Sequence, residues 1–177
     1  YTRATCWVYM AFDFQNSKVN QMMKWILGFT GILVGLYVLL ILGVYTMQRA
    51  LLYFPPDVYL SPADVNVPMQ EIKNSEGDIV SWWWPPLNPE GKVVMVFHGN
   101  GSAIYSNHHI FRDLIGAGHG VLSVGYPGYP GQGGTRTQSH IVGAAKAQYE
   151  WLLNQGIPGD HIVFYGTSIG SGVAAQL

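Results

Sequence analysis

An uncharged apolar run at residues 25–47 limits what this chain can fold into more than any other feature of its sequence. The run reads WILGFTGILVGLYVLLILGVYTM. As a helix it would be about 34 Å long, enough to cross a hydrocarbon core of about 30 Å. A helix that is apolar on every face does not suit the surface of a soluble domain. The sequence therefore predicts a transmembrane helix over 25–47, with the lipid bilayer as its partner.

Two other interpretations of this run, a buried core helix and a cleaved signal peptide, fit it less well. A core helix of a small domain is rarely apolar all round for this length. A cleaved signal peptide has a shorter apolar region, and no A-x-A-like cleavage site follows this one. We therefore interpret the run as an uncleaved, single-pass membrane anchor, preceded by an amino-terminal segment at 1–24.

The charges beside the run bear on its orientation. Lys18 and Lys24 precede it and Arg49 follows it, which favours a cytoplasmic amino terminus and a non-cytoplasmic domain. The chain does not open with Met, so the residues before Met22 or Met23 could lie upstream of the true start. A start there would leave Lys24 opposite Arg49 and nearly cancel the bias, so the side of the membrane stays open.

Composition excludes several classes of function. The formal net charge is −1 and no run of Lys and Arg occurs, so nucleic acid is not an expected partner. The single cysteine, Cys6, cannot form an internal disulfide. No Cys/His cluster has the spacing of zinc ligands, and we expect neither a metal nor an organic cofactor.

Residues 48–66 are rich in Pro and Asp and are predicted to be a linker. From residue 67 on, short apolar runs alternate with helical patterns. The order of two hairpin strands and then repeated strand–helix units indicates an α/β protein with a mostly parallel sheet over 67–177. The predicted strands are 67–73, 79–84, 93–97, 120–124 and 161–165, and the predicted helices are 107–117, 137–153 and one that begins at 169.

The sequence GTSIG at 166–170 matches G-x-S-x-G. The strand-like HIVFY precedes it and small residues that can begin a helix follow it. A nucleophile elbow is a sharp strand-to-helix turn that holds its serine in a strained backbone conformation. Gly166 and Gly170 would let strand and helix approach without a side-chain collision. A structural Gly-Ser turn is the alternative, and we interpret Ser168 as the nucleophile.

The sequence HGNG at 98–101 follows the strand predicted at 93–97. Acyl transfer needs two backbone N–H groups aimed at the developing oxyanion. Beside a nucleophile elbow they come from the residue after the nucleophile, here Ile169, and from the loop after the third strand, where Asn100 stands. Gly99 is small enough to let the backbone turn inward. Because the donor is a backbone group, the sequence predicts a mild effect for Asn100→Ala. His98 is interpreted as a loop histidine that orders the oxyanion loop, because in this fold the catalytic base follows the nucleophile in the chain.

The loop GYPGYPGQGG at 125–134 has two interpretations. It is either a turn punctuated by glycines or a segment that lines the site, and its composition does not separate the two.

These motifs together resemble a known family. The membrane segment, LLYFP at 51–55, the HGNG loop, the YPGYPG loop and GTSIGSG are similar to the membrane-anchored α/β-hydrolase family related to the bud-emergence proteins and the hydrolase-domain depalmitoylases. They also resemble the serine-aminopeptidase-like hydrolases. The resemblance covers about residues 45–177 and departs at Pro130, where we expect glycine. It implies the α/β-hydrolase fold, Ser168 as nucleophile, and Asn100 and Ile169 as oxyanion donors.

The order of catalytic residues in this family is Ser, then Asp, then His, and no histidine follows Ser168 here. We therefore expect a fragment, with the acid and the base beyond Leu177. The predicted function is a membrane-anchored serine hydrolase that cleaves an ester, thioester or amide of a small acyl or peptide substrate. The alternative is a catalytically silent binding module of the same fold, which the presence or absence of a later Asp and His would distinguish.

Overall fold

The computed structural model describes residues 2–88 and 90–177. The chain is divided into two compact units, with the boundary along the sequence between Gln48 and Arg49. The first unit is helical. Helix α1 (Thr2–Leu52), whose last residues from Arg49 on belong to the second unit, starts well before the predicted span. No Gly or Pro between residues 2 and 24 would end it, and both are strong helix breakers. Its part Lys18–Leu52 is long and apolar enough to cross a membrane, with a mean hydropathy of 2.4 and none of its most apolar window buried.

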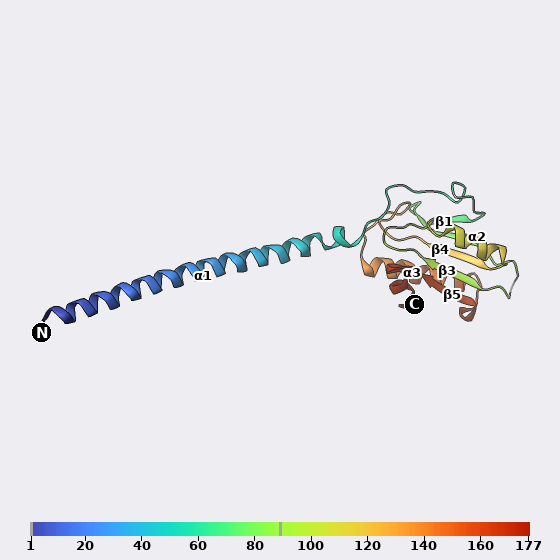
Figure 1. Ribbon diagram of the computed structural model, residues 1–177. Helices are drawn as coiled ribbons and strands as arrows, with labels where there is room; N and C mark the ends of the chain where they lie inside the picture. The colour runs from blue at the N-terminus through green and yellow to red at the C-terminus, as the bar shows by residue number, and fades with distance from the viewer. Residues whose placement is uncertain (1, 89) are drawn as a thin grey trace. The chain divides into compact units, whose positions relative to one another are not determined.

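The second unit is built on a five-stranded sheet with the order β1-β2-β4-β3-β5 (Figure 1). Strands β4, β3 and β5 are parallel neighbours, whereas β2 pairs antiparallel with both β1 and β4. The sequence predicted three strands with these bounds, while β1 is shorter and β5 lies one residue later. The strands are β1 (Gln70–Lys73), β2 (Ile79–Trp84), β3 (Val93–Phe97), β4 (Gly120–Val124) and β5 (Ile162–Gly166).

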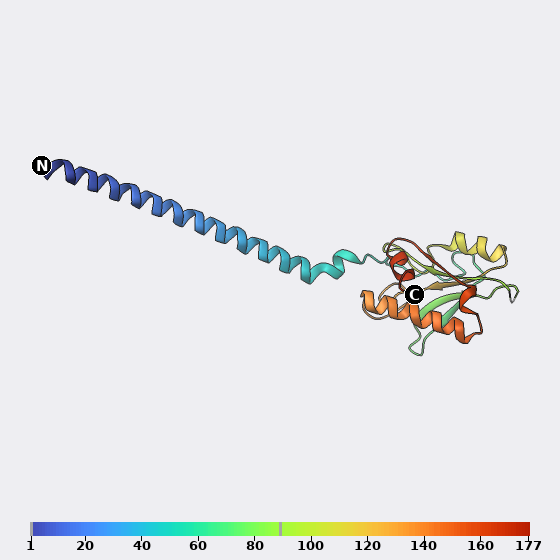
Figure 2. The same ribbon diagram turned by 90° about the horizontal axis from the view of Figure 1, so that it is seen from below.

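Helices cover both faces of this sheet. Helix α2 (His108–Gly116) lies on one side and α3 (Gln138–Asn154) on the other (Figure 2). Helix α4 (Ile169–Ala174) joins the layer of α3, because Val173 packs in the same core cluster as Ile141. All five residues of β3 and of β4 are buried, as expected for strands covered on both faces.

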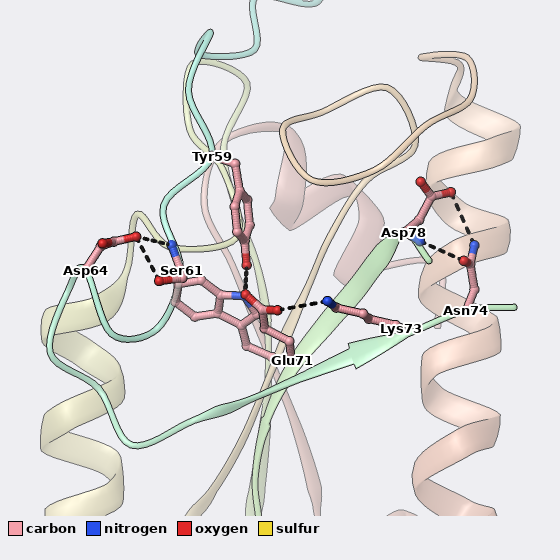
Figure 3. Close-up of polar contacts among 8 residues, drawn as sticks. Tyr59, Ser61, Asp64, Glu71, Lys73, Asn74 and Asp78 are labelled. Carbon is pink, nitrogen blue, oxygen red and sulfur yellow. Dashed lines mark hydrogen bonds and ion pairs between the residues drawn. The ribbon is translucent and has the colours of Figure 1, made fainter. Parts of the chain in front are cut away.

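Residues 53–66 differ from the predicted linker, because they are packed onto the sheet. The Tyr53 side chain is buried in the main core cluster. The Tyr59 hydroxyl donates to Glu71 Oε1 at 2.6 Å and accepts from Trp82 Nε1 at 2.9 Å, so it joins this segment to β1 and β2 (Figure 3). The Pro- and Asp-rich composition therefore belongs to turns of the folded unit, such as the one that Asp64 holds by its bonds to Ser61.

Candidate active site

The carboxyl ends of three parallel strands bring the predicted motifs to one edge of the sheet. Phe97, the last residue of β3, is in register with Val124 of β4 and Gly166 of β5. The loops that follow these strands therefore leave the sheet side by side. Open α/β sheets bind their ligands at such an edge. It carries HGNG at 98–101, the loop at 125–134 and the turn that contains Ser168.

Ser168 occupies a strained backbone conformation between β5 and α4. Its φ is 52° and its ψ is −120°, and Asn66 is the other non-glycine residue with positive φ in the described part of the chain. Such a conformation costs about 1–3 kcal/mol and persists only where its surroundings enforce it. The strain predicted from the G-x-S-x-G pattern is confirmed.

The two glycines of the motif are required by close backbone contacts. A Cβ atom on Gly166 would lie 2.6 Å from the Ser171 nitrogen, and one on Gly170 would lie 2.7 Å from the His98 carbonyl oxygen. Both distances are far below van der Waals contact. Strand β5, helix α4 and the end of β3 therefore touch through their backbones, as the motif predicted.

The HGNG loop lies against this turn. The Thr167 N–H donates to the Phe97 carbonyl at 3.1 Å. A Cβ on Gly99 would be 3.5 Å from the Ser168 Cβ, which is ordinary contact. The backbone N–H groups of Asn100 and Ile169 have no hydrogen-bond acceptor among the described residues. The structure thus leaves unpaired the two donors that the sequence assigned to the oxyanion.

Three aromatic rings support the HGNG loop. The His98 ring is buried, its centroid lies 3.9 Å from that of Tyr126 and 5.0 Å from that of Tyr129, and its Nδ1 donates to the Gly99 carbonyl at 2.9 Å. The Tyr126 hydroxyl donates to the His98 carbonyl at 3.1 Å. Both tyrosines are buried, so the loop at 125–134 supports the site as well as turning the chain.

Burial determines the charge state of these rings. It lowers the pKa of His98 to about 4, although the hydrogen bond to Gly99 opposes this. Burial also raises the pKa of Tyr126 and, to about 12, that of Tyr129. All three rings are therefore neutral at physiological pH. His98 is therefore not a group that titrates near neutrality, and its assignment as the histidine that orders the loop stays a prediction.

The Asn100 side chain has a role that the sequence reasoning missed. Its Oδ1 accepts from the Phe54 N–H at 3.0 Å and from the Tyr129 hydroxyl at 3.1 Å, while its Nδ2 donates to the Leu52 carbonyl. The prediction considered the Asn100 backbone alone. The available signal was the residue type itself, because an amide is a donor and an acceptor at once.

The Ser168 hydroxyl has no general base beside it in the part of the chain that the structure describes. The residue is exposed, and no described side chain hydrogen-bonds to its Oγ. Nor do three His, Cys, Asp or Glu side chains gather as metal ligands would within residues 18–88 and 90–177, whose side chains the structure describes.

Comparison with solved structures identifies similar folds. An esterase from Pyrococcus furiosus aligns with a TM-score of 0.51 and 22% identity over 71% of this chain and 50% of its own. An epoxide hydrolase from Vigna radiata aligns with a TM-score of 0.48 and 20% identity over 62% of this chain and 33% of its own. The chain has the α/β-hydrolase fold, and it spans about half the length of the esterase it matches.

Sequence comparison is less informative. No protein-family model matches the chain. A stretch of 92 residues, 51% of this chain, is 30% identical to the multifunctional-autoprocessing repeats-in-toxin of Vibrio cholerae, and covers 2% of that protein. Such a short match shows no family membership.

Two glycines of α4 offer a matched test of the backbone contacts. We expect Gly170→Ala to destabilise the domain, because the new Cβ would collide with the carbonyls of Phe97 and His98. Gly172→Ala should be neutral or stabilise it by up to about 1 kcal/mol, because its Cβ would meet open space within a helix. Urea unfolding midpoints measure both. Equal effects of the two substitutions would contradict the close approach.

The neutral state of His98 predicts a pH dependence of stability. The unfolded histidine takes up a proton near pH 6.5, whereas the folded one does so near pH 4. Its contribution to the free energy of unfolding is therefore complete above about pH 6.5 and declines as the pH falls towards 4. The difference in unfolding free energy between wild type and His98→Gln should shrink over that interval. A difference independent of pH would show that His98 is not held neutral.

Proposed function

We propose that this chain forms the amino-terminal half of a membrane-anchored serine hydrolase, with Ser168 as the nucleophile that attacks an ester, thioester or amide carbonyl. The observation that carries the proposal is the strained φ of Ser168 at the turn from β5 to α4. Backbone strain of this kind clusters at active sites, and this turn has both the position and the glycines of a nucleophile elbow.

The unpaired N–H groups of Asn100 and Ile169 support the same reaction. In the proposed mechanism the Ser168 oxygen bonds to the carbonyl carbon, and the carbonyl oxygen becomes the oxyanion that these two groups stabilise. Collapse of this intermediate expels the alcohol, thiol or amine and leaves an acyl-serine. Water then attacks the acyl-serine, releasing the acid and restoring the hydroxyl.

The proton of Ser168 needs an acceptor for this step. We propose that a histidine base and its carboxylate partner belong to the half of the fold that these 177 residues do not cover. The matched esterase supports this division, since half of its chain has no counterpart here. The helix Lys18–Leu52 supports the membrane anchor by its length and apolar composition.

A fluorophosphonate probe tests the nucleophile. In the full-length gene product the probe should label Ser168, because it reacts with an activated serine beside an oxyanion hole. Ser168→Ala should abolish labelling and hydrolysis of short acyl esters, whereas the exposed Ser139→Ala, on α3, should leave both intact. The 177-residue chain alone should label weakly, because no described side chain takes up the Ser168 proton. A folded, unlabelled full-length protein would favour a silent binding module instead.

Alkaline carbonate extraction tests the anchor. The protein should stay in the membrane pellet, because the helix Lys18–Leu52 is apolar and long enough to span. The double variant Leu36→Lys, Leu40→Lys places two charges in mid-span, each costing about 2.5–3.5 kcal/mol on insertion, and should be extracted. Wild-type protein in the soluble fraction at unchanged mass would contradict the anchor, and release at reduced mass would indicate a cleaved signal peptide.

A further inference from the structure

The Asn100 side chain joins the end of helix α1 to the oxyanion loop. Leu52 is the last residue of α1, and its carbonyl accepts from Asn100 Nδ2. The last carbonyls of a helix have no partner within the helix, so the amide supplies one. The Phe54 N–H, two residues later, donates to the other end of the same amide at 3.0 Å. Asn100 therefore binds the backbone on both sides of Tyr53.

Tyr53 also fixes this segment, through its side chain. Its side chain is 9% exposed and packs in the core cluster with Ile141 and Val173. Leu52 and Tyr53 also line a cavity of about 240 Å³ whose wall includes Ile169. The segment Leu52–Phe54 thus holds the Asn100 side chain by hydrogen bonds and lines the same cavity as Ile169.

We infer that the segment Leu52–Phe54, directly after the membrane helix, is part of the scaffold that shapes the oxyanion hole, and that the Asn100 side chain is the positioning group that couples the two. The inference rests on the proposed function. It assigns Asn100 two roles: the backbone N–H stabilises the oxyanion, and the side chain fixes where that N–H lies. A displacement of the chain where the anchor enters the domain is therefore transmitted to the hole.

This coupling changes the effect expected from substitution of Asn100. Loss of the side chain frees the loop from Leu52 and Phe54 while leaving the backbone donor in place. A displacement of about 1 Å at a catalytic group costs up to about 10²-fold in rate. We therefore expect Asn100→Ala and Asn100→Asp to lower kcat by about 10-fold or more with little change in KM, in contrast to the mild effect that the sequence predicted.

The decisive experiment is a double-mutant cycle in the membrane-bound, full-length protein. Asn100→Asp keeps the shape of the side chain but turns an oxygen towards the Leu52 carbonyl in place of the donor. Tyr53→Ala leaves Asn100 intact and removes the packing of the segment. Each should lower kcat and the rate of fluorophosphonate labelling of Ser168. The double variant should lose less than the two losses combined, because residues that act as one unit are not additive.

Control variants separate this coupling from a general loss of stability. Asn154→Asp makes the same chemical change at an exposed position at the end of α3 and should leave kcat unchanged. Unfolding midpoints identify variants that fail to fold, and Asn100→Ala, which introduces no repulsion, then replaces Asn100→Asp in the cycle.

Two outcomes would overturn the inference. Strictly additive effects on kcat would mean that Tyr53 and Asn100 act separately. If Tyr129→Phe reproduces the loss caused by Asn100→Ala while Tyr53→Ala leaves kcat unchanged, the side chain acts through Tyr129 alone. Failure of the proposed function is a distinct result, because the wild-type protein itself would then remain unlabelled.

Discussion

The backbone contact between α4 and the end of β3 is the constraint on which the rest of the site depends. Gly170 lies so close to the carbonyls of Phe97 and His98 that no side chain fits between them. This contact holds α4 over the sheet and forces the chain to turn sharply at Ser168, where φ is 52°. The strain of about 1–3 kcal/mol is offset by the burial of the strands and helix that enforce it.

The same contact explains why the two motifs meet although 70 residues separate His98 from Ser168. Strands β3 and β5 are parallel neighbours, and Phe97 is in register with Gly166. Neighbouring parallel strands whose last residues are in register end at the same edge of the sheet, so the loops that follow them begin side by side. The HGNG loop and the Ser168 turn therefore need no further element to bring them together, and the hydrogen bond from the Thr167 N–H to the Phe97 carbonyl joins them directly.

Much of this geometry could be predicted from local sequence, and the reasons are steric. A β-branched run such as 93–97 has few alternatives to a buried strand, and G-x-S-x-G places glycines where backbones touch. The pairing of β2 with β4 and the strand order could not be predicted, because they depend on contacts far apart in the chain. The packing of residues 53–66 was missed for a similar reason: Tyr59 acquires its role from Trp82 and Glu71.

The side chains that support the HGNG loop are neutral, and this suits the chemistry proposed for the loop. Buried His98, Tyr126 and Tyr129 hold the loop with packed rings and hydrogen bonds, and none is charged at neutral pH. A fixed charge there would add to or oppose the field of two backbone N–H groups. Because the supporting side chains are neutral, the stabilisation of an oxyanion would depend on where those N–H groups lie. The position of the Asn100 N–H in turn depends on the contacts that hold Asn100. An amide can accept from the Phe54 N–H and donate to the Leu52 carbonyl at the same time, so asparagine at this position links the geometry of the HGNG loop to the chain that leaves helix α1.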